Sequence, residues 1–257
     1  MTTISGDAAA FRSLHHGRTA SGPLVLPGPW DAASARAFAD AGFRALATPS
    51  AGVSAVLGYA DGSAPADEMF AAVARIVRAV AADGVMVTAD LEDGYGLPPA
   101  EFVERLLETG AVGCNLEDSD RVTGRLKDAA EHADRLSRIR AEAGDRLVIN
   151  ARTDTFLRGD RTAPDAGPAI ARCQLYARAG ADCAFPILAP AELLPEITRA
   201  VPVPVNAIAL PNGPSPRELG ELGVARVTFG GGLHRRTMAV VADMAASLWE
   251  QGEAETA

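Results

Sequence analysis

Short apolar runs alternate with longer amphipathic segments along almost the whole chain. Eight of the runs have the length and composition of strands, and they cover residues 23–28, 44–50, 84–91, 111–118, 146–153, 183–188, 204–210 and 225–231. Strands that are apolar on both faces, each followed by one helix, indicate a parallel sheet built from right-handed βαβ units. The pattern therefore predicts an α/β protein.

The segments between these runs have the spacing of amphipathic helices. Several of them end at a glycine, which favours the left-handed conformation of a helix C-terminus: Gly42, Gly110, Gly144, Gly180 and Gly223. Residues 9–17 predict an extra helix before the first strand. Residues 250–257 are polar and are expected to form a frayed tail.

Eight strand–helix repeats in a chain of 257 residues predict a (β/α)8 TIM barrel. An open doubly wound sheet is the alternative, but it normally carries GxGxxG after its first strand, and "LPGPWDAAS" is not such a motif. No linker or low-complexity block divides the chain. We therefore expect one barrel domain over residues 1–257.

Charge and composition narrow the possible partners and compartment. The chain has 24 Lys and Arg against 33 Asp and Glu, and its net charge of −9 argues against nucleic acid or an anionic membrane as a partner. No apolar run is long enough to span a bilayer, and the first residues lack the apolar core of a signal peptide. Cys114, Cys173 and Cys183 have no CxxC spacing, which is typical of buried thiols in a reducing compartment. We expect a cytoplasmic protein.

Polar residues gather at the C-terminal ends of the predicted strands, where barrel enzymes carry their chemistry. They are Trp30, Asp31, Ser50, Ala51, Gly52, Asp90, Glu92, Asn115, Glu117, Asp118, Asn150, Arg152, Asp154, Asn206 and His234. In "VMVTADLEDGYG" (85–96), Asp90 and Glu92 share strand parity, so both are expected to face the barrel mouth, whereas Asp93 turns away.

Clustered carboxylates are unfavourable unless a cation neutralises them. Oxygen ligands without a Cys/His pattern select a hard ion, Mg²⁺ or Mn²⁺. For each acid alone, a helix cap or a solvated strand end is an equally good interpretation. Recurrence of acids on adjacent strands favours the metal site.

Two further features have an ordinary and a functional interpretation. Arg152 lies inside an apolar strand and requires an anionic partner, which is either Glu117 or Asp154 or an anionic substrate. The small residues of "TPSAGVSA" would let backbone N–H groups approach a ligand carboxylate, but small residues also fill tight strand–helix corners.

The motifs "PGPWDAASAR", "ADLEDGYG", "GCNLEDS" and "NARTDTF" resemble those of the isocitrate lyase/phosphoenolpyruvate mutase superfamily, over roughly residues 10–245. The resemblance implies a Mg²⁺-dependent (β/α)8 barrel that binds 2-oxo acids or their enolates. It also implies that neighbouring barrels exchange the eighth helix within a homodimer or homotetramer.

By this resemblance Asp90 is the direct metal ligand, and Glu92, Glu117 and Asp61 are the acids that complete the metal site through bound water. The strand-end positions and the resemblance together assign substrate binding to Trp30, Asp31, Ser50, Ala51, Gly52, Asp90, Arg152, Asn206 and His234. The candidate catalytic residues are Arg152, Glu117 and Tyr95. Tyr95 and His234 are candidate proton donors, and a structural role near the exchanged helix is the alternative for His234.

The lid segment departs from the superfamily patterns. Residues 119–132, "SDRVTGRLKDAAEH", lack the K-[KR]-C-G-H sequence of isocitrate and methylisocitrate lyases and the lysine- and proline-rich pattern of the phosphonopyruvate enzymes. Arg121, Thr123, Arg125 and Lys127 either reach an anion when the lid closes or lie at a solvated helix start. Cys114 lies within a strand and is interpreted as a core residue.

Three functional hypotheses follow. The first is a Mg²⁺-dependent lyase that cleaves a C–C bond of a small 2-oxo dicarboxylate through a metal-stabilised enolate, either by decarboxylation of an oxaloacetate-like acid or by retro-aldol cleavage. Decarboxylation needs no dedicated base, and the lid offers none. The second is a phosphonopyruvate mutase or hydrolase. The third is a barrel that binds a 2-oxo acid without catalysis.

Overall fold

The computed structural model describes residues 4–16, 22–159 and 164–254. Within these residues the strands are β1 (Leu24–Val25), β2 (Ala45–Ala47), β3 (Met86–Asp90), β4 (Gly113–Glu117), β5 (Val148–Thr153), β6 (Cys183–Pro186), β7 (Asn206–Ile208) and β8 (Arg226–Thr228). Each strand lies inside the apolar run that predicted it, and all paired strands are parallel. The predicted α/β class is confirmed.

Helices alternate with the strands. They are α1 (Ile4–Ser13), α2 (Ala32–Asp40), α3 (Ser50–Leu57), α4 (Ala66–Val80), α5 (Pro99–Glu108), α6 (Ala129–Ala143), α7 (Thr155–Arg158), α8 (Ala166–Arg178), α9 (Leu194–Ala200), α10 (Pro216–Glu221) and α11 (Gly232–Ala254). The five glycines expected at helix C-termini all have positive φ. Helix α3 was not predicted, because its small residues carry no clear amphipathic period.

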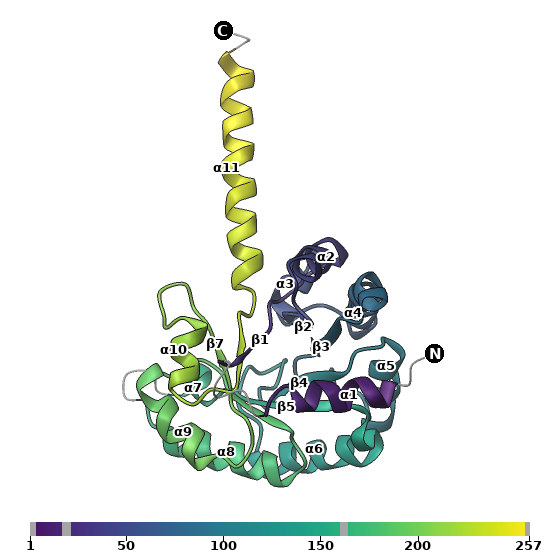
Figure 1. The fold of residues 1–257 in the computed structure, drawn as a ribbon, viewed down its shortest axis with the longest axis vertical. Coiled ribbons are helices and arrows are strands. Elements are labelled where there is room, and N and C mark those ends of the chain that lie inside the picture. Colours follow the sequence, from purple (N-terminus) through teal and green to yellow (C-terminus); the bar gives the residue numbers. More distant parts are fainter. Residues whose placement is uncertain (1–3, 17–21, 160–163, 255–257) are drawn as a thin grey trace.

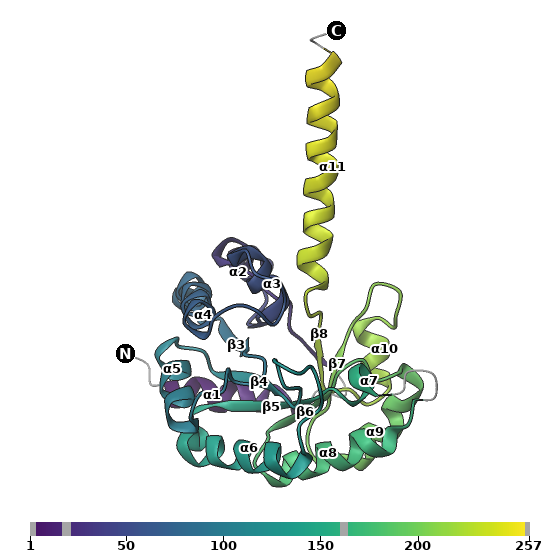
Figure 2. The same ribbon diagram turned by 180° about the vertical axis from the view of Figure 1, so that it is seen from behind.

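Hydrogen bonding divides the strands into two parallel sheets, with the orders β1-β8-β7 and β2-β3-β4-β5-β6. An Ala184–Val205 bridge joins the sheets on one side. On the other side the Ala47 N–H donates to the Pro27 carbonyl at 3.1 Å. The strands thus follow one another around a TIM-like barrel, and α6, α8 and α9 lie in a row along its outside (Figure 2).

Helix α1 packs at the N-terminal ends of the strands. Its Phe11 is buried in an apolar cluster with Leu24 of β1 and Val148 of β5. Arg12 forms an ion pair with Asp182 at 2.7 Å and donates to the Leu147 carbonyl at 3.0 Å. The helix therefore covers the N-terminal end of the barrel. The polar site residues lie at the opposite end, at the C-termini of the strands. Gly17, the last residue of the helix expected over 9–17, lies outside the described residues.

Helix α11 projects away from the rest of the molecule (Figure 1). Its large apolar side chains are between 42% and 70% exposed, and they are Met238, Val240, Val241, Met244, Leu248 and Trp249. Where fraying was expected from residue 250, the helix continues to Ala254, and residues 255–257 lie outside the described residues. Across the described part of the chain, no helix has the length and apolar character needed to cross a bilayer.

Candidate active site

Asp90 ends β3 and is fixed by the end of the neighbouring strand. Its N–H donates to Thr48 Oγ1 at 3.2 Å. Its Oδ2 accepts hydrogen bonds from the Ser50 hydroxyl at 2.9 Å and from the Ser50 N–H at 3.3 Å. Its Oδ1 is buried and has no hydrogen-bond partner among the described residues. One oxygen is therefore held in place while the other is available to a ligand.

Arg152, inside β5, binds two carboxylates at once. Its Nη1 lies 2.6 Å from Glu117 Oε2, and its Nε and Nη2 lie 2.6 and 3.0 Å from the two oxygens of Asp154. Asp154 is fully buried and also accepts from the Ser119 hydroxyl at 2.5 Å. Both acids that the sequence offered as partners of Arg152 thus bind it, and the guanidinium is held between the ends of β4 and β5.

Two further acids, Glu92 and Asp61, lie near Asp90. Glu92 is buried beyond the end of β3, and its Oε2 lies 2.6 Å from Arg121 Nε. Burial raises the pKa of Glu92 to about 7. Asp61 lies in the loop before α4, and burial followed by the charge of Asp90 raises its pKa. Burial likewise raises the pKa of Glu117, against the opposing effect of Arg152.

The charges of this group leave room for a cation. Glu92 and Glu117 are each paired with an arginine, but within the described residues Asp61 and Asp90 have no basic side chain within 4.0 Å. With Asp154, which shares Arg152 with Glu117, the group holds more carboxylates than guanidinium groups, and a divalent ion would neutralise part of this excess. The described residues contain no group of three His, Cys, Asp or Glu side chains placed to ligate an ion directly. An ion held at this site would therefore keep most of its water, as Mg²⁺ does.

The raised pKa of Glu92 predicts how stability depends on pH. The carboxyl titrates near 4.5 when unfolded and near 7 when folded, so the folded state retains the proton longer. Glu92 should therefore contribute a loss of up to about 3 kcal/mol of unfolding free energy in the metal-free protein as pH rises from about 4.5 to 7. Urea unfolding at pH 5 and pH 7.5 in EDTA measures this change. Glu92→Gln should change the slope by this contribution alone, because Glu117, whose pKa is also raised, keeps its own. The exposed Glu131→Gln should leave the profile as in the wild type, and an unchanged slope in Glu92→Gln would contradict the assignment.

The first turn of α3 contains Ser50, Ala51 and Gly52, whose N–H groups have no partner within the helix. A Cβ at Gly52 would lie 3.0 Å from Pro49, 3.3 Å from Trp30 and 3.4 Å from His234. Glycine is therefore required for this close packing. The turn presents backbone donors beside Asp90, as an anion site at a helix N-terminus does.

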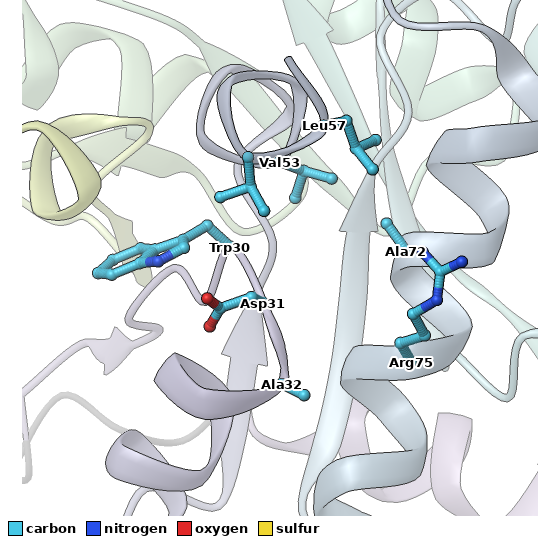
Figure 3. A pocket seen from close by; sticks show the side chains of 8 residues that line it. Trp30, Asp31, Ala32, Val53, Leu57, Ala72 and Arg75 are labelled. Atoms are coloured by element: carbon cyan, nitrogen blue, oxygen red, sulfur yellow. The ribbon is translucent and has the colours of Figure 1, made fainter. Parts of the chain in front are cut away.

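Trp30 and Asp31 follow β1, but their contacts are with other residues than the four site acids. Asp31 caps α2 by accepting the Ser34 N–H at 2.7 Å, and the Trp30 ring lies 5.2 Å from that of His234, at the start of α11. Both line a mainly apolar pocket of about 230 Å³ among α2, α3 and α4, together with Val53 and Arg75 (Figure 3). Their predicted role in substrate binding stays a prediction.

Asn206 belongs to a polar network inside the barrel. Its Oδ1 accepts from Asn150 Nδ2 at 3.0 Å, and the same Nδ2 donates to Asn115 Oδ1 at 2.8 Å. Asn115 Oδ1 also accepts from Arg226 Nη2 at 3.2 Å. Asn150, Asn206 and Arg226 are completely buried. Arg226 was not among the predicted site residues, because it lies at the start of its strand and not at the C-terminal end. Like Arg152, however, it is an arginine within an apolar strand.

Tyr95 has a buried hydroxyl without a partner among the described residues, and its ring packs against Phe70. Burial, followed by the nearby charges of Glu92 and Asp90, strongly raises its pKa. The hydroxyl therefore stays protonated at neutral pH, and the raised pKa makes it a weaker acid than an exposed tyrosine. Its predicted role as a proton donor stays a prediction.

A parallel TIM-like barrel with carboxylates and an arginine at its strand ends defines a class of barrel proteins whose chemistry lies at the strand C-termini. The family model described as phosphoenolpyruvate phosphomutase matches residues 11–249. The chain belongs to the isocitrate lyase/phosphoenolpyruvate mutase superfamily, a group of lyases and mutases, as the four motifs predicted.

Three similar proteins place the chain within this superfamily. A crystal structure of a candidate phosphonomutase from Burkholderia cenocepacia J2315 has a TM-score of 0.88 and 39% identity, over 95% of this chain and 99% of that one. An uncharacterized protein of Mycobacterium tuberculosis is 36% identical over 86% of this chain and 81% of its own length. The 2-methylisocitrate lyase of Bacillus subtilis (strain 168) is 29% identical over 81% and 69%.

Proposed function

We propose that this protein is a Mg²⁺-dependent lyase that cleaves a C–C bond of a small 2-oxo dicarboxylate, with Mn²⁺ as a possible substitute ion. The observation that carries the proposal is the buried, unpartnered Oδ1 of Asp90. The charge of Asp90 acts on Asp61, Glu117 and Arg152, so these groups lie near it. A bound Mg²⁺ ion would act as a Lewis acid that stabilises the negative charge of the enolate.

The protein's own groups have separate roles in this proposal. Asp90 holds the ion directly, and Asp61, Glu92 and Glu117 hold its water. The first turn of α3 orients one substrate carboxylate through backbone N–H groups, and Arg152 orients the developing oxyanion. Tyr95 supplies the proton that the enolate carbon receives after the bond breaks.

Decarboxylation of an oxaloacetate-like acid agrees best with the lid. Residues 119–132 contain no cysteine, and their one histidine, His132, is buried against Tyr176. Loss of CO₂ requires no dedicated base. The alternative, a phosphonopyruvate mutase or hydrolase, is supported by the phosphonomutase description of the Burkholderia relative. The cations of the lid would then bind the phosphoryl group.

The exposed apolar side chains of α11 support a further part of the proposal, the exchange of this helix between two copies of the chain. An apolar face of this size is unfavourable in water. Docking against a neighbouring barrel would bury it and give a homodimer or homotetramer.

A turnover screen tests the proposed function. The protein is incubated with oxaloacetate, phosphonopyruvate, 2-methylisocitrate or isocitrate, with Mg²⁺ or with EDTA, and the products are followed by NMR. We expect Mg²⁺-dependent loss of CO₂ from oxaloacetate. Turnover of phosphonopyruvate alone would support the alternative, and binding without any turnover would support the non-catalytic barrel.

A further inference from the structure

The loop after β3, residues 90–97, has an unfavourable backbone conformation. Glu92 and Tyr95 have φ values of 52° and 57°, in the left-handed region that favours glycine, and they are separated by Gly94 at 83°. Such conformations cost of order 1 kcal/mol or more for each non-glycine residue and persist only where the surrounding structure enforces them. This loop, which we call the metal loop, therefore needs external support.

Three basic side chains from residues 121–135 provide that support. Arg121 forms the ion pair with Glu92, and its guanidinium carbon lies 4.6 Å from the centre of the Tyr95 ring. Lys127 Nζ binds Asp93 Oδ2 at 2.9 Å. Arg135 donates to the Leu97 carbonyl at 3.0 Å and to the Gly94 carbonyl at 3.4 Å. Arg121 thus contacts both of the left-handed non-glycine residues.

Arg121 also holds a third segment, the loop that carries Asp61. Its Nη2 donates to the Gly62 carbonyl at 2.8 Å and to the Ala64 carbonyl at 3.2 Å, and its Nε donates to the Gly62 carbonyl at 3.2 Å. One side chain of the lid therefore connects Glu92 with the backbone next to Asp61. Of the four acids assigned to the metal site, Asp90 and Glu117 are the last residues of β3 and β4, whereas Glu92 and Asp61 lie in loops.

A tight turn in the lid holds Arg121 in place. Asp120 Oδ1 accepts from the Val122 N–H at 3.1 Å, the Thr123 N–H at 2.7 Å and the Thr123 hydroxyl at 2.8 Å. An antiparallel bridge between Ser119 and Leu126 closes the turn at its base. Arg125, on the same turn, is exposed, and no side-chain ion pair is present for it among the described residues.

We propose that Arg121 is a positioning residue that holds Glu92 and the Asp61 loop at the spacing that a hydrated divalent ion requires. In this arrangement the lid forms one wall of the metal site. The part of this inference that concerns the ion rests on the proposed function, whereas the part that concerns the metal loop does not. The guanidinium acts through Glu92, Tyr95 and two carbonyl groups and does not touch substrate.

Hydrogen exchange measured by mass spectrometry on the metal-free protein tests the support of the metal loop. In Arg121→Gln, peptides that cover residues 91–97 and 61–65 should exchange at least about tenfold faster, because local opening no longer breaks these contacts. The matched control, Arg125→Gln, should exchange as the wild type does. Unchanged exchange in Arg121→Gln, or equal acceleration in Arg125→Gln, would overturn the inference.

Mn²⁺ binding, followed by electron paramagnetic resonance, tests the effect on the ion. Loss of a residue that orients metal-site groups typically weakens affinity about 10- to 100-fold, and we expect this for Arg121→Gln. Arg121→Lys keeps the positive charge beside Glu92 but loses the hydrogen bonds to the Gly62 and Ala64 carbonyls. Its Mn²⁺ affinity should therefore lie between those of Arg121→Gln and the wild type, while residues 61–65 still exchange faster than in the wild type. If Arg121→Gln does not fold, Arg121→Lys carries the test, and wild-type exchange at 61–65 in that variant would overturn the inference. The exchange experiment uses no metal or substrate, so its failure is distinguishable from failure of the turnover screen.

Discussion

Asp90→Asn is expected to abolish Mn²⁺ binding and to lower kcat/KM by about three orders of magnitude or more, because a Lewis acid supplies several kcal/mol of transition-state stabilisation. The amide keeps the shape of the side chain and its contact with the Ser50 hydroxyl. It removes the negative charge and, with its single oxygen accepting from Ser50, presents an NH₂ group to the ion in place of an oxygen. Isothermal titration with Mn²⁺ and steady-state kinetics on the substrate that turns over measure the two effects.

The same substitution should act in the opposite direction on stability. Asp90 lies near other carboxylates, so its removal relieves repulsion in the metal-free protein, and unfolding in EDTA should require more urea than for the wild type. Asp83→Asn, at the end of the helical turn before the same strand, should leave Mn²⁺ binding unchanged and alter stability by less than about 1 kcal/mol, because its ion pair with Arg36 is exposed. An Asp90→Asn protein that binds Mn²⁺ with wild-type affinity would exclude a metal site built on this residue.

Arg152→Met is expected to lower the unfolding free energy by about 3–5 kcal/mol, the usual cost of breaking a buried ion pair by removing one partner. Glu117 and Asp154 are both buried, and each would remain without its cation. In a chain of this size the loss corresponds to a fall in Tm of roughly 10 °C. Urea unfolding in EDTA gives the free energy, and a change below about 1 kcal/mol would mean that the two carboxylates are already protonated when Arg152 is present.

Two further variants separate charge from packing at Arg152. Glu117→Gln added to Arg152→Met should recover part of the lost free energy, because one uncompensated carboxylate is removed. Arg217→Met breaks the exposed pair between Arg217 and Glu221, whose side chains are 89% and 63% exposed. Exposed pairs contribute little, so this control should change stability by less than about 1 kcal/mol.

Hydrophobic pattern predicted the strands well, because a strand covered on both faces leaves a compact apolar run between two amphipathic segments. The same criterion placed the end of one run too late. Residues 44–50 were expected to be a strand, yet β2 ends at Ala47 and α3 begins at Ser50. Pro49 precedes α3 without a side-chain cap, so neither an amphipathic period nor a capping residue marks the start of this helix.

The candidate site was predictable where chemistry and strand position coincide. Asp90, Glu117 and Arg152 lie at strand ends, and the structure brings them together. Arg121 was only one of several lid cations in the sequence, because its function depends on where a turn of irregular backbone directs its side chain. Arg226 could have been found, since "ARVTFGG" contains an arginine within an apolar run just as "VINART" does.

The position of α1 has a consequence for the order in which the protein acquires its structure. Arg12 binds Asp182 and the Leu147 carbonyl, which follow it by 170 and 135 residues. During synthesis α1 leaves the ribosome long before these partners exist, so Phe11 can at first meet only nearby residues of its cluster such as Leu24, and not Val148. Contacts of such long sequence separation form late and slow folding. The helix that closes the base of the barrel is therefore made well before these partners and docks late.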